Sequence, residues 1–122
     1  MPSLATVERF VAQVLSGDHV GAIRDWYAED AFMQENLGHR RLGRETLMAQ
    51  EAATLDRVAA VKTELLDPPL VDGDRVALHW RFTFTPKDGA PARVLEEIAW
   101  QTWRGDQVAK ETFFYDPAQL GR

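Results

Sequence analysis

The 122-residue chain contains no cysteine. This absence excludes disulfides, thiolate nucleophiles and thiolate metal ligands, and it agrees with a reducing compartment. Long apolar runs are also missing, since no segment approaches the about 20 apolar residues that span a bilayer. The first ten residues include Glu8 and Arg9, and they lack the continuous apolar stretch of a secretory signal. We therefore expect a cytoplasmic protein that does not enter a membrane.

Clustered positive charge is scarce as well. The formal net charge is −5, whereas a nucleic-acid or anionic-membrane surface calls for clustered basic residues. The one local positive cluster, residues 39–44, is interpreted as a solvated loop. The histidines His19, His39 and His79 lack the spacing of metal ligands, and no phosphate loop or dinucleotide fingerprint occurs. We expect no nucleic-acid partner, no metal and no cofactor.

The remaining composition is that of an ordinary globular protein. Hydrophobic residues make up 45% of the chain and charged residues 27%, which is neither a disordered nor a membrane composition. The length suits one hydrophobic core, and no linker, repeat or low-complexity tract divides the sequence. We expect a single domain over residues 1–122.

Three helices are predicted in the N-terminal half from apolar residues at helical spacing. The first covers residues 4–15 and stops at Ser16-Gly17. The second follows Asp18, whose carboxylate can accept hydrogen bonds from free backbone amides, and should end between residues 28 and 30. The third begins at Arg44. Its buried face is expected to hold Leu47, Met48, Ala52 and Leu55.

The clearest strand covers residues 75–85, where large apolar side chains at even positions alternate with mostly polar ones at odd positions. This alternation indicates a sheet that is covered on one face. Shorter strands are expected at residues 31–36 and 61–66. The order of elements predicts an α+β fold, in which a curved, antiparallel-rich mixed sheet is wrapped by the three helices.

A hairpin over residues 96–117 is the most informative stretch, because it places carboxylates among large aromatic side chains. Gly105-Asp106 is suited to a two-residue turn, since glycine takes positive φ without steric cost. That register pairs Trp100 with Glu111. One wall of a pocket would then hold Glu96, Trp100, Glu111, Phe113 and Tyr115.

A three-residue turn is the alternative register. It would pair Ala99 with Glu111, turn Trp103 inward and exchange Glu96 for Glu97. We prefer the two-residue turn because its two faces separate apolar from polar side chains more completely. It also leaves Trp103 and Phe114 on the outer face, where they would form an adhesive patch. We therefore expect a homodimer.

The residues quoted next carry a family resemblance over nearly the whole chain. The segment GDHVGAIRDWYAEDAFMQEN (17–36), the helix start GRETL (43–47) and the strand end FFYDP (113–117) resemble the SnoaL-like branch of the NTF2-like superfamily. The resemblance implies a cone with a pocket between sheet and helices, in a group that includes ketosteroid isomerases, polyketide cyclases and epoxide hydrolases. It also implies a catalytic base at Glu35. The isomerases' oxyanion tyrosine and aspartic acid fall at Phe10 and near Ala99, so both donors are replaced here.

Glu111 is the strongest candidate for chemistry. In a pocket its carboxyl would lose hydration, which raises the pKa and makes it an acid or base near neutrality; otherwise it forms a salt bridge on a solvated face. Glu35 is either a second such group or a strand-end carboxylate in solvent. Tyr115 either donates to a developing oxyanion or packs half-buried. Substrate contacts are expected from Tyr27, Trp80, Phe82, Glu96, Trp100 and Phe113.

These residues favour a small, cofactor-independent enzyme that acts on an apolar, ring-bearing organic molecule. Glu35 and Glu111 would be acid and base, and Tyr115 a hydrogen-bond donor. Isomerisation, cyclisation, hydration and hydrolysis all remain open. The alternatives are a ligand-binding module without turnover and a dimeric interaction module.

Overall fold

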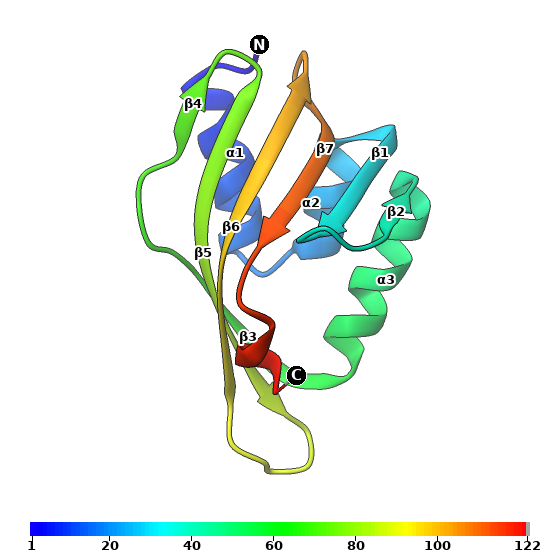
Figure 1. Cartoon of the computed structure of the whole chain (residues 1–122), viewed down its shortest axis with the longest axis vertical. Helices are drawn as coiled ribbons and strands as arrows, with labels where there is room; N and C mark the ends of the chain where they lie inside the picture. The colour runs from blue at the N-terminus through cyan, green and yellow to red at the C-terminus, as the bar shows by residue number, and fades with distance from the viewer. Residues whose placement is uncertain (122) are drawn as a thin grey trace.

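The computed structural model describes residues 1–121, which form one strand-rich sheet with helices against it (Figure 1). None of the helices in this range is long and apolar enough to cross a membrane. The helices are α1 (Leu4–Leu15), α2 (His19–Trp26), α3 (Arg44–Asp56) and the short 3-10 helix η1 (Pro117–Leu120). The strands are β1 (Tyr27–Glu35), β2 (Arg40–Leu42), β3 (Val58–Leu65), β4 (Leu70–Asp72), β5 (Arg75–Pro86), β6 (Arg93–Arg104) and β7 (Gln107–Phe114).

The sheet is mixed, as the sequence predicts. Its strands follow the order β2-β1-β7-β6-β5-β3, and β4 pairs with a further part of β5. Within residues 1–121, β1 and β7 run parallel and the other neighbouring strands are antiparallel. The central strands β5 and β6 bend along their length and continue past the helices into a hairpin (Figure 1). The predicted α+β architecture, a mixed sheet wrapped by three helices, is confirmed.

The helices cover one face of the sheet and create the core there. In Figure 1, α1 and α2 lie behind the sheet and α3 lies beside β1 and β2. Phe10 of α1 packs edge-on against Trp103 of β6, with ring centroids 5.8 Å apart. Asp18 caps α2 by accepting a hydrogen bond from the Gly21 amide at 3.1 Å, as predicted. We call the sheet face that contacts the helices the inner face, and the opposite sheet face the outer face.

Two helix details differ from the sequence prediction. Helix α2 ends at Trp26, two or more residues early, because Tyr27 already pairs with Val108 in the sheet. On α3, Leu47 is buried but Ala52 is exposed. Glu51 lies on the partly buried side in place of Ala52. Helical spacing alone did not separate this glutamate from the solvent-facing residues around it.

The hairpin between β6 and β7 has the predicted turn but a different register. Arg104 pairs with Gln107, which confirms the two-residue turn. The ladder then shifts between Thr102 and Trp103, because β7 holds one extra residue, Ala109, as a β-bulge. Glu111 therefore pairs with Gln101 and not with Trp100.

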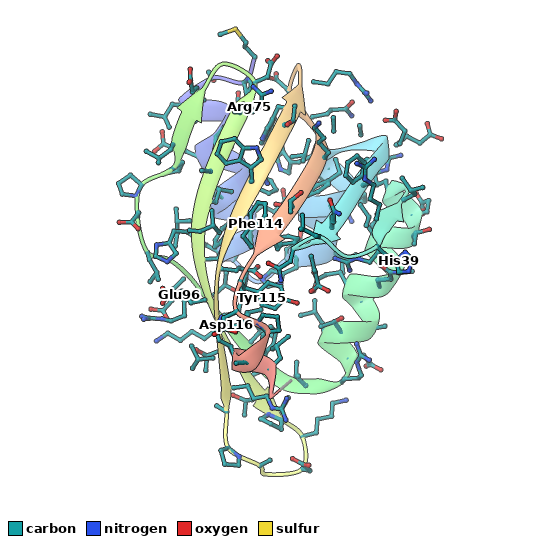
Figure 2. The ribbon with its side chains drawn as sticks, in the orientation of Figure 1. His39, Arg75, Glu96, Phe114, Tyr115 and Asp116 are labelled. Carbon is teal, nitrogen blue, oxygen red and sulfur yellow. The ribbon has the colours of Figure 1, made fainter. Side chains whose placement is uncertain are left out.

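This shift reverses the predicted faces of β6. Trp100 is 46% exposed and Trp103 is 2% exposed, so the prediction that Trp100 and Glu96 face inward is wrong. Glu96 lies on the outer face, as does Phe114 (Figure 2). The outer patch that we expected from Trp103 and Phe114 is instead made by Ile98, Trp100 and Phe114.

Candidate functional site

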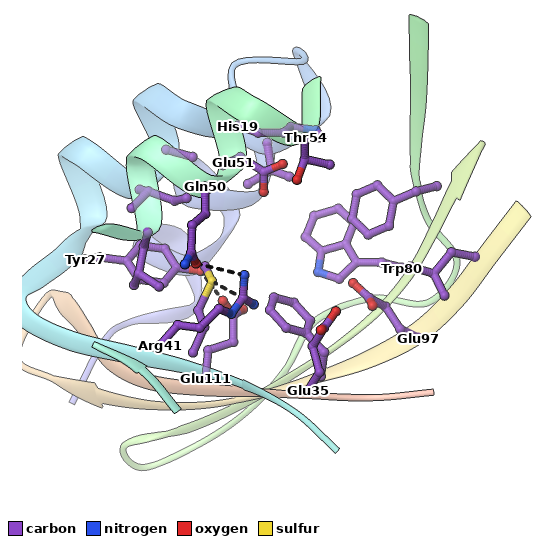
Figure 3. A pocket seen from close by; sticks show the side chains of 18 of the residues that line it. His19, Tyr27, Glu35, Arg41, Gln50, Glu51, Thr54, Trp80, Glu97 and Glu111 are labelled. Atoms are coloured by element: carbon purple, nitrogen blue, oxygen red, sulfur yellow. Dashed lines mark hydrogen bonds between the residues drawn. The ribbon is translucent and has the colours of Figure 1, made fainter. Parts of the chain in front are cut away.

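A cavity of about 180 Å³ lies between the inner face of the sheet and the helices (Figure 3). An apolar cavity of about 150 Å³ accommodates one benzene ring, so the space suits a small molecule built on a single ring. Every helix α1–α3 and the strands β1, β2, β5, β6 and β7 contribute to its wall. The lining residues are Phe10, Val14, His19, Ala22, Ile23, Tyr27, Met33, Glu35, Arg41, Leu47, Gln50, Glu51, Thr54, Trp80, Phe82, Phe84, Leu95, Glu97, Glu111 and Phe113.

Glu111 anchors a buried hydrogen-bond network at the floor of this cavity. It is 2% exposed. The Tyr27 hydroxyl donates to its Oε1, and the Gln101 amide Nε2 donates to its Oε2 at 2.7 Å. Trp103 in turn donates from its indole Nε1 to Gln101 Oε1 at 2.9 Å. Both carboxylate oxygens of Glu111 are therefore held in place from β1 and β6.

The environment of Glu111 tunes its proton affinity from two sides. Burial raises the pKa of its carboxyl, and the donors Tyr27 and Gln101 hold that pKa down by stabilising the charged form, with a net result of about 7. A carboxyl with a pKa near 7 divides between acid and base forms at neutral pH, which is the condition for proton transfer catalysis.

Glu97 is a second buried carboxyl, four residues before Gln101 on the same face of β6. It is 8% exposed and lines the cavity. Its carboxyl makes no hydrogen bond or ion pair with any residue in the described range 1–121. Burial raises its pKa to about 8, and the charges of Glu111, Glu35 and Glu51 add to the rise. At neutral pH this carboxyl is mostly protonated.

An aromatic ladder on β5 forms the wall beside Glu97. Trp80 is the direct cross-strand partner of Glu97, and directly opposed side chains lie about 4.5–5.5 Å apart at their Cβ atoms. The rings of Trp80 and Phe82 stack with centroids 5.8 Å apart, and Phe82 and Phe84 stack at 6.2 Å. The site therefore presents carboxyl groups next to flat aromatic faces.

The remaining polar groups come from α2, α3 and β2. Burial raises the pKa of Glu51 and lowers that of His19, whose Nε2 lies 2.9 Å from Thr63 Oγ1. Arg41 donates to Gln50 Oε1 at 3.3 Å and to Met33 Sδ at 3.9 Å (Figure 3). Its guanidinium forms no ion pair within residues 1–121.

Six of the nine residues predicted for the site line the cavity. They are Tyr27, Glu35, Trp80, Phe82, Glu111 and Phe113. Glu35 is exposed and lies at the mouth of the cavity. Both alternatives considered for Glu35 therefore apply, since it is a strand-end carboxylate in solvent and also lines the pocket. Their parts in binding and catalysis stay predictions.

Glu96, Trp100 and Tyr115 are absent from the lining. Because the bulge at Ala109 pairs Glu111 with Gln101, Glu96 and Trp100 lie on the face opposite Glu111, and Glu96 meets His79 Nε2 at 3.0 Å on the outer face. Tyr115 follows the end of β7, where its backbone amide donates to Asn36 Oδ1 at 3.1 Å. The phenol that lines the cavity is that of Tyr27, and a part for Tyr115 in the site stays a prediction.

Sequence reasoning missed several polar members of the site, and four of them show the local reasons. Arg41 belongs to the cluster that we interpreted as a solvated loop, but β2 pairs with β1 and brings it inward. Glu51 resembles a solvent-facing helix residue. Glu97 and Gln101 were placed outside by the assumed register. One signal could have found Glu97 and Gln101. They alternate with the apolar residues of an i, i+2 series that shares one strand face, namely Leu95, Glu97, Ala99, Gln101 and Trp103.

No three His, Asp or Glu side chains among residues 1–121 gather closely enough to hold a metal ion. The chemistry that these lining residues can supply themselves is proton transfer by carboxyl groups in an aromatic enclosure.

Known protein families and solved structures were compared with this chain. The SnoaL-like domain family matches residues 7–111. No curated protein sequence matches the chain. Among solved structures, a Mesorhizobium loti protein provisionally assigned as a SnoaL-like polyketide cyclase is 24% identical, with a TM-score of 0.78 over 94% of this chain and 100% of that one.

Two further structures agree. A protein of Jannaschia sp. CCS1 with the same provisional assignment is 14% identical, with a TM-score of 0.79 over 96% of this chain and 90% of its own. An NTF2-like protein of unknown function from Burkholderia pseudomallei is also 14% identical, with a TM-score of 0.80 over 98% of this chain and 95% of its own. At these identities the likeness establishes the fold. Since the family match spans most of the sequence, the chain belongs to the SnoaL-like domain family.

Proposed function

We propose that this protein is a cofactor-independent acid/base enzyme that acts on a small, apolar, ring-bearing organic molecule. The observation that carries the proposal is the buried Glu111, fixed by Tyr27 and Gln101 at the floor of a cavity with aromatic walls. SnoaL-like and NTF2-like folds are associated with ligand binding and with cyclase and isomerase roles, which is consistent with this chemistry.

The economical reaction is abstraction of a proton from a carbon next to a carbonyl. Glu111 takes the proton, the electron pair of the C–H bond moves into an enolate, and the new carboxylic acid returns the proton to the same or another carbon. Tyr27 and Gln101 keep the carboxylate oriented during both steps. Glu35 at the mouth exchanges protons between the cavity and solvent.

A deuterium-exchange assay tests this proposal without knowledge of the natural substrate. Cyclohexanone and 1-indanone are incubated in D₂O with the protein, and deuterium at the α-carbon is followed by NMR. We expect the wild type to accelerate exchange and Glu111→Gln to lose at least about 100-fold of that acceleration. Glu35→Gln should lose less, because water can replace a proton carrier at the mouth.

The matched control is Glu96→Gln, which changes the neighbouring carboxyl on the outer face and should leave the rate unchanged. If the wild type gives no acceleration, or if Glu111→Gln retains it, the enzyme proposal fails. The second candidate, a binding module without turnover, is favoured by the replacement of the isomerase donors at Phe10 and Ala99. It predicts that ring compounds bind while no exchange is catalysed.

A further inference from the structure

The cavity lining holds more acidic groups than basic ones. Among the described residues, four carboxyls and one guanidinium, that of Arg41, line it. Arg41 bonds to Gln50 and Met33 and pairs with none of the carboxyls in the described chain. Burial lowers the pKa of His19, the other basic lining group, and so disfavours the charged form of its ring. The four carboxyls are Glu35, Glu51, Glu97 and Glu111.

Glu97 is the most deeply buried of the carboxyls in this group that have no partner in the described chain. Glu111 has two donors, whereas Glu35 is exposed and Glu51 is only partly buried. Glu97 as a residue is 8% exposed, and its carboxyl lines the cavity without a hydrogen-bond or ion-pair partner among residues 1–121. A buried polar group normally has a partner, because leaving it without one costs about 1–3 kcal/mol. The Glu97 oxygens open to the cavity, so a ligand that displaces water from the cavity has to supply that partner in its place.

The groups around Glu97 favour a ligand that carries a positive charge. Its cross-strand neighbour Trp80 stacks on Phe82, and aromatic faces attract cations through their quadrupole. An anionic ligand would offer no opposite charge to any of the four lining carboxyls. A cation would satisfy Glu97 and stack on these rings at once.

We propose that the pocket selects a ring-bearing organic cation, whose ammonium nitrogen lies between the Glu97 carboxyl and the faces of Trp80 and Phe82. The inference rests on the proposed function of the cavity as a small-molecule site and specifies the class of its ligand. It does not require Glu97 to take part in the chemical step that Glu111 performs.

The arrangement also implies a pH dependence of binding. The pKa of Glu97 in the free protein is about 8, so the carboxyl must lose its proton when a cation binds at neutral pH. Binding should therefore tighten as the pH rises from 6 to 9. The charged and titratable groups that face Glu97 from the packed elements are Glu111 on β7, Glu35 on β1, Glu51 on α3, Arg41 on β2 and His19 on α2.

A matched pair of probes tests the proposal. Benzylamine is a cation at pH 7.5 and benzyl alcohol is its neutral counterpart of the same size. By isothermal titration calorimetry or ligand-observed NMR, we expect wild-type protein to bind benzylamine at least about tenfold more tightly, equivalent to about 1.4 kcal/mol. Glu97→Gln should reduce the preference to less than about threefold and leave benzyl alcohol binding unchanged.

Two further measurements sharpen the test. Benzyltrimethylammonium carries a fixed charge, so tighter binding at pH 9 than at pH 6 reports the lining carboxyls and not the ligand, and the part of this change that Glu97→Gln loses belongs to Glu97. Buffers of different ionisation enthalpy should reveal release of most of one proton at pH 7. Glu96→Gln, on the outer face, is the control that should keep the full preference for the amine.

The possible outcomes separate this inference from the proposed function. Equal binding of the two probes, or a preference that survives in Glu97→Gln, overturns the cation inference while the small-molecule site stands. A preference for benzylamine without catalysed deuterium exchange supports the inference and overturns the enzyme proposal. If neither probe binds at about 10 mM, a concentration at which even very weak sites fill, both are overturned.

Discussion

At the scale of single residues, the orientation of the Gln101 amide decides how Glu111 behaves. A glutamine amide can present either its oxygen or its nitrogen to a neighbour. The Trp103 indole is a donor only, so it fixes the Gln101 oxygen and leaves the nitrogen to donate to Glu111. Trp103 is thus a positioning residue that acts on Glu111 through Gln101.

Trp103→Phe should therefore raise the pKa of Glu111 above about 7. The phenyl ring keeps most of the packing, but the amide is free to turn its oxygen toward the carboxylate, which disfavours the charged form. An NMR titration of ¹³C-labelled glutamate carboxyls measures the change, and the acid limb of the deuterium-exchange rate should move to higher pH with it.

Trp100→Phe is the control for this experiment, because Trp100 lies on the outer face and should leave the pKa of Glu111 unchanged. A purely structural role of Trp103 would lower the free energy of unfolding in Trp103→Phe without moving that pKa. This result would contradict the positioning role.

At the scale of elements, the register of the hairpin shows where sequence reasoning stops. The alternation in β5 and the turn at Gly105-Asp106 could be predicted because each follows from local residue types. The bulge could not be predicted, because neither Ala109 nor its neighbours in the sequence are glycine or proline, the residue types that often indicate a bulge. Burial of Trp103 and pairing of Gln101 with Glu111 are non-local and favour the shifted ladder.

Helix α3 offers a direct test of the corrected buried face. Leu47 is 1% exposed whereas Ala52 faces solvent. Leu47→Ala should lower the free energy of unfolding by about 2–5 kcal/mol, because it leaves a cavity in the core. Ala52→Lys should change it by less than about 0.5 kcal/mol. Urea denaturation of the two variants measures both values, and a large loss in Ala52→Lys would restore the face expected from the sequence.

At the scale of the whole molecule, the buried carboxyls make stability depend on pH. The folded-state pKa of Glu97, about 8, and that of Glu111, about 7, both lie above the ordinary value of 4.5. At pH values between 4.5 and about 8, the glutamates of the unfolded chain have already released protons that Glu97 and Glu111 retain in the folded protein. Raising the pH through this window therefore lowers the free energy of unfolding.

Glu97→Gln removes the larger of these two contributions. We expect its free energy of unfolding to be close to that of the wild type at pH 5 and to exceed it by about 1–4 kcal/mol at pH 9, because one pKa unit corresponds to about 1.4 kcal/mol. Urea denaturation at both pH values measures the gap. Glu29→Gln, at an exposed position, should show no such trend. A gap that stays constant with pH would contradict the proton linkage.

The whole fold also separates two surfaces that could serve different purposes. The pocket occupies the inner face of the sheet, while Ile98, Trp100 and Phe114 are 38–46% exposed on the outer face. Ile98 and Phe114 are direct cross-strand partners, so the three side chains form one continuous outer patch. A dimer built on this patch would leave the pocket open.

We propose that the protein forms a homodimer through this outer patch, as a sheet face with contiguous exposed aromatic side chains favours association. Sedimentation velocity at tens of micromolar should show a dimer, whose interface would bury about 1,200–2,000 Å². The double change Trp100→Lys and Phe114→Lys should yield a monomer that still binds pocket ligands. Leu37→Lys, at a 92% exposed loop position, should leave the dimer intact. A wild type that sediments as a monomer at about 100 μM, well above the Kd of a stable dimer, would rule out this assembly.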